Sequence, residues 1–304
     1  MCWTFVTLFY LLSTVFITLL AIPVYFKWNE PMILRDLLLY GKLAGPGLHT
    51  RVSVIEIPKR YFCHFYLVAT FTSLAALSLL VLQYVFNVAF PTGFTWYVRF
   101  MANRETVQAT SATAILLTAS LFLLHSVRRM YESIFVSVYS NSKMNLAHYV
   151  LGICHYCLVP TVFLAVAPEL KSVPISVFAR LFDITVTQVF GLSMFCWASY
   201  QQHRCCSHLA AMRKNDYGQI VTRIHAIPDG GWFNLISSPH YSFEILIYVS
   251  LSLTLCTTSS LWAAVLLFVV TNQCWASALV HAWYREKFGA EYPQQRKALI
   301  PYLL

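Results

Sequence analysis

Charge is scarce in this sequence. Only 11% of its 304 residues are Asp, Glu, Lys or Arg, whereas a soluble globular domain has about 25%. Apolar residues make up 58% of the chain, and its mean hydropathy is +0.62. A deficit of this size argues against an ordinary soluble domain and indicates a protein that lies largely within a membrane.

The short motifs of soluble nucleotide-dependent enzymes are missing too. The ten glycines form no GxGxxG loop and no Walker phosphate loop, and Gly45-Pro46-Gly47 is a lone GxG without a predicted strand before it. HExxH and GxSxG are also absent. These absences argue against a Rossmann domain, so a redox cofactor would have to bind by another route.

The cysteines do not follow a pattern that is typical of disulfide-bonded proteins. There are nine of them, an odd number, and several lie inside apolar runs, so we expect no set of disulfides. The segment Cys154-His155-Tyr156-Cys157 has zinc-like spacing but no second CxxC to complete it. We therefore interpret these residues as core filler and expect no metal site.

Long apolar runs fill the chain instead. The first lacks a positively charged start and is too long for a signal peptide, so it is interpreted as a membrane span. In the fifth, Arg180 and Asp183 are three residues apart and are expected to pair. The uncharged break at 257–260 predicts a tight hairpin between the last two runs. The seven candidate spans, each near 20 residues, are 3–26, 65–90, 107–126, 145–167, 177–200, 242–258 and 260–282.

Basic residues indicate how these spans are oriented. With a lumenal N-terminus and a cytosolic C-terminus, 17 of the 21 Lys and Arg residues fall on the cytosolic side, as membrane topology favours. The net charge of +9 is spread over the loops rather than gathered in one basic domain, so we expect no nucleic-acid partner. The sequence predicts an all-α integral membrane protein of about seven transmembrane helices, built as one domain over 1–304.

Several sequence blocks carry a specific resemblance. The tail reads HAWY at 281–284, YP at 292–293 and RKALIP at 296–301; upstream lie LAAMRK at 209–214, RIHAIP at 223–228 and SSPHY at 237–241. These blocks resemble the steroid 5α-reductase family. IPKRYFCHFY at 57–66 and HSVRRMYES at 125–133 are similar to its polyprenol reductase branch. The resemblance extends from about residue 40 to the end of the chain.

The resemblance implies a function and a place. It implies a multi-pass enzyme of the endoplasmic reticulum membrane that uses NADPH to reduce the α-isoprene double bond of a long-chain polyprenal or polyprenol, supplying dolichol for protein N-glycosylation. It implies that 201–304 is the NADPH-binding part, that Glu56 lies at the substrate end, and that Cys206 and Ser126 depart from the steroid branch. The residues it implies at or near the cofactor are Gln202, Arg213, His240, Glu244, His281, Tyr284 and Arg296.

The residues themselves are compatible with this chemistry. Phosphate groups are gripped by guanidinium and ammonium groups, and the predicted cytosolic side offers several, although simple positive-inside anchoring is an alternative. Glu244 and His281 lie in or at the end of apolar runs, where an ionisable group normally faces a polar cavity or a partner. Tyr284 could instead be an aromatic-belt residue. The cations considered for phosphate binding are Arg129, Arg213, Arg223, Arg285, Arg296 and Lys297.

The reaction suggests which groups are needed. A hydride adds readily to an alkene conjugated with a carbonyl, and charge then builds on the carbonyl oxygen. Glu56, if kept protonated by a low-dielectric site, could stabilise that charge, assisted by Tyr131 or Tyr66. His281 is a further candidate catalytic residue. An allylic alcohol lacks the electron sink, so we expect polyprenal rather than polyprenol to accept the hydride.

Other functions stay open at this point. A steroid 4-ene-3-one reductase would share fold, cofactor and reaction. A trans-2-enoyl-CoA reductase shares an R-R-x-x-E element, here Arg128, Arg129 and Glu132. A membrane transporter or scaffold is the non-enzymatic alternative, although a transporter would show inverted repeats that we do not find. The isoprenoid chain length and the oligomeric state are not specified by the sequence.

Overall fold

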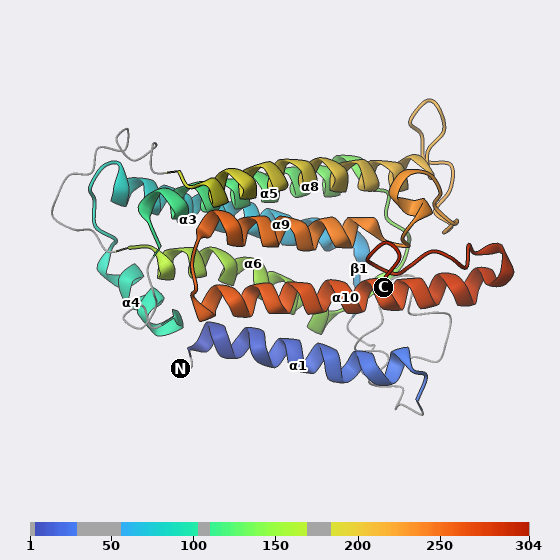
Figure 1. Cartoon of the computed structure of the whole chain (residues 1–304), viewed down its shortest axis with the longest axis horizontal. Coiled ribbons are helices and arrows are strands. Elements are labelled where there is room, and N and C mark those ends of the chain that lie inside the picture. The colour runs from blue at the N-terminus through green and yellow to red at the C-terminus, as the bar shows by residue number, and fades with distance from the viewer. Residues whose placement is uncertain (1–3, 29–55, 103–109, 169–183, 304) are drawn as a thin grey trace.

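Long helices dominate the computed structural model of the chain, which describes residues 4–28, 56–102, 110–168 and 184–303 (Figure 1). Seven helices of 17 to 29 residues occur in these ranges, and each overlaps one predicted span. They are α1 (Phe5–Tyr25), α3 (Cys63–Tyr84), α5 (Ala112–Tyr131), α6 (Leu146–Val166), α8 (Val186–Ala211), α9 (Pro239–Leu255) and α10 (Ser260–Phe288).

The helix ends differ from the predicted ends in an informative way. Helix α5 begins later than its predicted span and continues to Tyr131, so that Arg128 and Arg129 are helical. The predicted hairpin is confirmed: α9 ends at Leu255, Cys256 adopts a left-handed conformation with φ of 49°, and α10 begins at Ser260. The expected pair of Arg180 and Asp183 lies outside the described residues.

Four of the long helices are long and apolar enough to cross a membrane. They are α1, α6 and the segments Lys59–Tyr84 and Ser260–Glu291, which contain α3 and α10. Helices α5, α8 and α9 carry polar residues on their buried faces, including Ser126, Gln202 and Glu244. A short helix that the sequence did not predict, α4 (Thr92–Ala102), joins the bundle near α6 and α1.

The helices alternate in direction and divide the connecting segments between two ends (Figure 1). One end carries α4 and the start of α1. The other end carries a two-stranded antiparallel sheet of β1 (Glu56–Pro58) and β2 (Lys143–Asn145), the segment 212–238 and the C-terminal tail. The polar stretches expected on one side of the membrane therefore gather at one end of the bundle.

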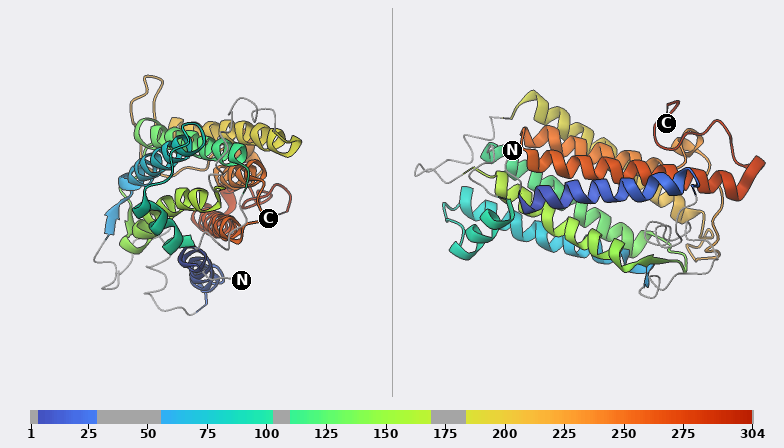
Figure 2. Two further views of the ribbon diagram at one scale, coloured as in Figure 1. Left: turned by 90° about the vertical axis from the view of Figure 1, so that its left-hand side faces the viewer. Right: turned by 90° about the horizontal axis from the view of Figure 1, so that it is seen from below.

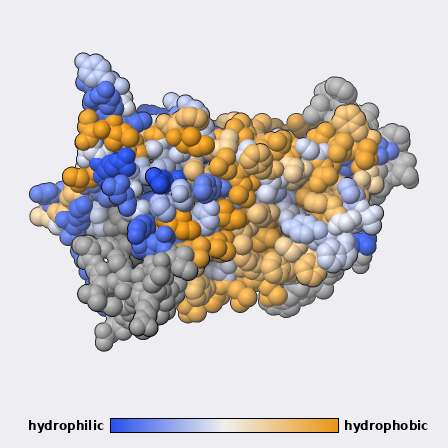
Figure 3. Space-filling model, turned by 180° about the vertical axis from the view of Figure 1, so that it is seen from behind, coloured by the Kyte–Doolittle hydropathy of each residue, from blue (hydrophilic) through white to orange (hydrophobic). Residues whose placement is uncertain are grey.

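The surface also differs between the ends and the middle of the bundle in its hydrophobicity. On the face shown in Figure 3, hydrophilic residues concentrate at the end that carries the sheet and the tail, and an apolar band crosses the middle of the bundle. Helix α1 lies at the margin of the bundle against α10 (Figure 2). Side chains from α5, α6, α8, α9 and α10 form one continuous core, in which Phe122, Phe163 and Tyr248 are almost fully buried.

Candidate active site

Two adjoining cavities lie between the helices. The inner cavity, about 290 Å³, is enclosed by residues of α3, α5, α6, α8, α9 and α10. The outer cavity, about 520 Å³, lies between α8, the segment 222–226, the start of α9 and Tyr284. The five residues that line both cavities, and so mark their junction, are Lys59, Ser137, Tyr139, His240 and Tyr241.

Glu244 is the centre of the polar wall of the inner cavity. Its side chain is 7% exposed, and its carboxylate accepts a hydrogen bond from Gln202 Nε2 at 2.5 Å. His125 Nε2 lies 3.4 Å from the other carboxylate oxygen. Gln202 Oε1 accepts from Arg128 at 2.6 Å. A buried carboxylate held in this way is an anionic acceptor facing the cavity, which is where ionisable groups inside apolar bundles are normally found.

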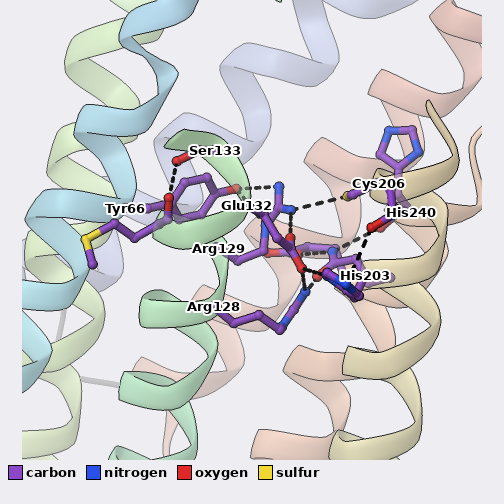
Figure 4. Close-up of polar contacts among 12 residues, drawn as sticks. Tyr66, Arg128, Arg129, Glu132, Ser133, His203, Cys206 and His240 are labelled. Atoms are coloured by element: carbon purple, nitrogen blue, oxygen red, sulfur yellow. Dashed lines mark hydrogen bonds and ion pairs between the residues drawn. The ribbon is translucent and has the colours of Figure 1, made fainter. Parts of the chain in front are cut away.

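A second carboxylate, that of Glu132, organises the two arginines of α5 (Figure 4). It is fully buried and pairs with both Arg128, at 2.6 Å, and Arg129. His203 Nδ1 lies 2.9 Å from the same carboxylate. Burial alone would raise the pKa of Glu132, but Arg129 and Arg128 outweigh it, and the pKa lies below its usual value. The carboxylate is therefore ionised and fixes both guanidinium groups.

The backbone at Glu132 is unusual. Helix α5 passes at this residue into a π-helical turn, Glu132–Val136, closed by a hydrogen bond from Ser137 N to Glu132 O at 2.8 Å. Such turns are rare and are frequent at functional sites. This turn directs Ser137 and Tyr139 into the junction of the two cavities. Burial raises the pKa of Tyr139, so its hydroxyl stays protonated.

Apolar and aromatic side chains form a further part of the lining of the inner cavity. They include Phe65 of α3, Leu151 of α6, and Phe268 and Val269 of α10. His155 is hydrogen-bonded through Nε2 to Tyr248 at 3.0 Å, and its Nδ1 lies 3.3 Å from the Tyr10 hydroxyl. The lining of the inner cavity thus combines a buried carboxylate with apolar and aromatic side chains, and α10 adds two amide side chains.

The outer cavity is rich in donors. Arg213 lines it, donates to the carbonyl of Val138, and lies 2.9 Å from His225 Nδ1. Its partial burial lowers the pKa of Arg213 from its ordinary value, but the guanidinium remains a cation. Tyr284 is 4% exposed and stacks on Tyr292, with ring centroids 5.5 Å apart. Tyr284 is therefore a core residue and not a belt residue.

The start of α9 faces this cavity with two serines that behave differently. Ser237 Oγ lies 2.6 Å from His281 Nδ1 and 2.5 Å from the Tyr292 hydroxyl. Ser238 is 1% exposed and occupies the N-cap position, but its hydroxyl makes no capping bond and has no partner among the described residues. Ser238 therefore offers a free hydroxyl at a helix N-terminus, a position that favours anions.

Comparison with known proteins assigns the chain to a family. Residues 142–304 match the family model for 3-oxo-5-alpha-steroid 4-dehydrogenase. The chain is 37% identical over 267 residues to a protein of Caenorhabditis elegans named polyprenal reductase, a match that covers 87% of this chain and 85% of the relative. Proteins of the same name from Xenopus tropicalis and Homo sapiens are 34% and 32% identical, over 89% of this chain and 88% and 86% of theirs.

The chain belongs to the 3-oxo-5-alpha-steroid 4-dehydrogenase family. The resemblance found in the sequence is confirmed, and membership makes the chain an oxidoreductase that acts on a CH–CH group. The relatives place it on the polyprenal reductase branch of that family.

In this family member, most of the expected cofactor residues lie at the two cavities. Arg129, Gln202, His240 and Glu244 line the inner one, and Arg213, His240 and Tyr284 line the outer one. Two residues lie just behind the outer cavity: His281 contacts Ser237, and Arg296 is 5% exposed and donates to the carbonyl of Pro228 at 2.6 Å.

Three expected residues lie elsewhere. Glu56 is paired with Lys143, 2.9 Å away, in the small sheet and is not among the residues that line either cavity. Tyr131 is 53% exposed at the end of α5, beside Phe135. Arg223 is exposed and bonds to Asn141 at 3.2 Å. The structure does not bring these side chains to the lining of either cavity: Glu56 lies in β1, Tyr131 is the last residue of α5, and Arg223 lies in the segment 212–238.

Other residues of the site were not singled out by sequence reasoning. Glu132 was predicted only as the last residue of an R-R-x-x-E element. His125 and Ser238 lie within the blocks that resemble the family, but no role was predicted for either. A charged residue one turn beyond two arginines is a weak signal, because exposed i,i+4 pairs are common on helices. Ser126, which departs from the steroid branch, is fully buried and donates to Phe122 O at 2.8 Å.

The residues at the cavities fit the dinucleotide that the family implies. The unpartnered Ser238 hydroxyl and the Arg213 guanidinium are donors suited to phosphate or ribose oxygens. The Glu244 carboxylate, at the far side of the junction, is an acceptor suited to an amide N–H. Phosphate-binding groups in the outer cavity and an amide-binding group in the inner cavity would hold an extended dinucleotide across the junction.

Proposed function

We propose that this chain is an NADPH-dependent polyprenal reductase of the endoplasmic reticulum membrane. It saturates the α-isoprene double bond of a long-chain polyprenal, giving dolichal, and so supplies dolichol for protein N-glycosylation. Its relatives are named for polyprenal reduction, which supports the aldehyde as the substrate. The segment 201–304 supplies the cofactor contacts in this proposal, except for that of Arg129 on α5.

One observation carries the proposal: the lining of the inner cavity combines the buried Glu244 carboxylate with apolar and aromatic side chains. An isoprenoid chain has no polar groups except at its end, so it needs apolar walls along its length and a polar group only at its head. A soluble polar substrate would place its polar groups against the apolar side chains of Phe65, Leu151 and Phe268, which offer no hydrogen bonds.

The site must both bind NADPH and polarise the carbonyl group of the aldehyde. NADPH, when bound, supplies the hydride. Arg213 and Ser238 would hold its phosphates or ribose, and Glu244, positioned by Gln202, would hold the carboxamide. The aldehyde carbonyl acts as the electron sink for addition to the β-carbon, so the site must offer a donor to that oxygen. The α-carbon takes up the accompanying proton.

The proposed membrane arrangement extends the four apolar helices to seven spans. Helices α5, α8 and α9 run alongside those four, and several of their buried polar side chains, including Gln202 and Glu244, line the inner cavity. With the sheet end facing the cytosol, the C-terminus is cytosolic and the N-terminus is lumenal, in agreement with the distribution of Lys and Arg.

A turnover assay with the purified full chain tests this function. Polyprenal, polyprenol and a 4-ene-3-one steroid are offered side by side with NADPH, without any alcohol dehydrogenase, and the saturated products are identified by mass spectrometry. We expect rapid saturation of polyprenal and slow or no saturation of polyprenol. Preferential turnover of the steroid would move the chain to the steroid branch, and no oxidation of NADPH with any substrate would contradict the proposal.

Matched arginine variants test the cofactor assignment. Arg213→Ala should raise KM for NADPH by roughly 10- to 100-fold, because a charge-assisted contact to a phosphate is lost. Arg204→Ala is the control, since Arg204 is exposed on α8 and lies over the Tyr200 ring. An equal rise in KM for NADPH in the two variants would mean that Arg213 acts only through the general positive charge at the sheet end of the bundle. His281→Ala and Glu56→Gln test the two catalytic assignments that rest on sequence.

A further inference from the structure

The guanidinium of Arg129 and the hydroxyl of Tyr66 form a close pair inside the bundle (Figure 4). Arg129 donates to the Tyr66 oxygen from Nη2 at 3.0 Å and from Nε at 3.3 Å. Tyr66 lies on α3 and Arg129 on α5, and both line the inner cavity. Because Arg cannot accept a hydrogen bond, the tyrosine oxygen is the acceptor in both contacts.

Glu132 holds this pair in place from behind. Arg129 Nη1 donates to the Glu132 carboxylate and also to Cys206 Sγ, 3.3 Å away. Each nitrogen of the guanidinium therefore has a partner, and its plane is fixed. Glu132 is itself fixed by Arg128 and His203. The resulting chain, from Glu132 through Arg129 to Tyr66, is rigid and buried.

The hydrogen of the Tyr66 hydroxyl must therefore point away from Arg129. A cation that donates twice to the oxygen polarises the O–H bond and strengthens the hydroxyl as a donor. Tyr66 is 4% exposed, and the ring of Tyr156, which also lines the inner cavity, is its neighbour at a centroid distance of 5.4 Å. The hydroxyl is thus a strengthened donor within the cavity wall.

We propose that Tyr66 is the catalytic residue that donates a hydrogen bond to the carbonyl oxygen of the aldehyde. This inference rests on the proposed function. As a hydride joins the β-carbon, the C=C π electrons move to form an enolate, and its oxygen becomes negative. Tyr66 stabilises that oxygen while Arg129 stabilises the phenol, and the α-carbon then takes a proton from solvent water as the carbonyl reforms.

Other hydroxyl groups are less suited to this role. Tyr248 is engaged with His155 Nε2 at 3.0 Å, and Ser126 donates to the backbone of its own helix. Tyr131 is largely exposed. Glu56 is paired with Lys143 in the small sheet. Among the described residues, Tyr66 alone combines a cavity-lining hydroxyl with a guanidinium that donates to its oxygen.

Tyr66→Phe is the direct test, because it removes the hydroxyl and keeps the ring. We expect kcat with polyprenal to fall roughly 10²- to 10³-fold, the cost of losing one donor to a developing oxyanion. The dissociation constant of NADPH, measured by fluorescence titration, should stay within about twofold of the wild-type value. The control is Tyr149→Phe on α6, whose hydroxyl bonds to His64 at 2.9 Å and which does not line the inner cavity.

A spectroscopic readout tests the contact without turnover. The carbonyl stretch of a ¹³C-labelled saturated aldehyde, dolichal, is recorded by infrared difference spectroscopy in the wild type and in Tyr66→Phe. A hydrogen bond lowers the frequency, so removal of the hydroxyl should shift the band to higher wavenumber. An unchanged band, or a kcat within about threefold of the wild-type value, would overturn the assignment.

Tyr156→Phe separates the two neighbouring hydroxyls. A loss of kcat confined to Tyr156→Phe would assign the donor to Tyr156 and overturn the proposal for Tyr66. The wild-type assay is a separate control: a wild type that does not saturate polyprenal contradicts the proposed function. A wild type that does so while Tyr66→Phe is equally active contradicts only the role of Tyr66.

Discussion

Gln202 on α8 donates through Nε2 to the carboxylate of Glu244 on α9, 2.5 Å away. Its Oε1 accepts from Arg128 on α5 at 2.6 Å. The amide therefore has one orientation only, because a flipped amide would set its oxygen against the carboxylate and its NH₂ against the guanidinium. One side chain joins three helices at the polar wall of the inner cavity.

Replacement of Gln202 should lower the stability of the protein, and the loss should be larger when both of its hydrogen bonds are removed than when one is kept. Gln202→Leu removes one buried hydrogen-bond partner from each of Glu244 and Arg128, which costs roughly 1–3 kcal/mol for each group and lowers the melting temperature in detergent. Gln202→Asn keeps the amide but is one methylene shorter, so it can satisfy only one of the two neighbours. We expect its melting temperature to lie between those of the wild type and Gln202→Leu; equal stability of all three proteins would contradict this account.

The bundle was largely predictable from the sequence, because apolar runs and loop charges are strong signals. Each predicted span overlaps a helix, and the hairpin at 257–260 is present. The count of helices apolar enough to cross a membrane was not predictable in the same way. Helices α5, α8 and α9 carry buried polar residues that satisfy one another across helices, and such partners lie far apart in sequence.

Close packing of α8 against α9 depends on Gly191. A Cβ added there would lie 2.9 Å from Thr254 Cγ2 and 3.0 Å from the backbone oxygen of Ser250. Gly191→Ala should therefore force the two helices apart and destabilise the protein by roughly 1–3 kcal/mol. Gly93→Ala on α4 is the matched control, because nothing lies within 4 Å of its added Cβ. We expect a lower melting temperature for Gly191→Ala only; a similar drop in both would contradict the packing explanation, because helix propensity alone favours Ala over Gly.

The two serines before α9 should respond in opposite ways. Ser238→Ala removes a hydroxyl without a partner among the described residues, so the ligand-free protein should keep its melting temperature. Its dissociation constant for NADPH should rise roughly fivefold to tenfold, the worth of one hydrogen bond. Ser237→Ala breaks contacts with His281 and Tyr292 and should lower the melting temperature without NADPH. The assignment fails if Ser238→Ala binds NADPH as tightly as the wild type.

The site was less predictable than the bundle. The expected cofactor residues Gln202, His240 and Glu244 do meet at one cavity. The partners of Arg129 could not be read from the sequence, because an R-R-x-x-E pattern is compatible with an exposed helix face. Only the π-helical turn and the packing of α8 bury the Glu132 carboxylate and make it the anchor of both arginines.

Stability should depend on pH through Glu132. Its pKa in the folded protein lies below the ordinary value of 4.5, because Arg129 and Arg128 outweigh the effect of burial. A lowered carboxyl pKa contributes stability that is fully present above the unfolded pKa and is lost as pH falls through the folded pKa. The difference in melting temperature between the wild type and Glu132→Gln should therefore be constant above about pH 5 and shrink below pH 4.5.

A surface carboxylate provides the control for this profile. Glu286 pairs with Lys27 at 3.0 Å, and both side chains are largely exposed, so Glu286→Gln removes the same charge from a solvated pair. Its melting temperature should follow that of the wild type at every pH. If Glu132→Gln also followed the wild type from pH 7 to pH 3.5, the buried carboxylate would not be ionised, and Arg129 would need another anchor to hold its guanidinium against Tyr66.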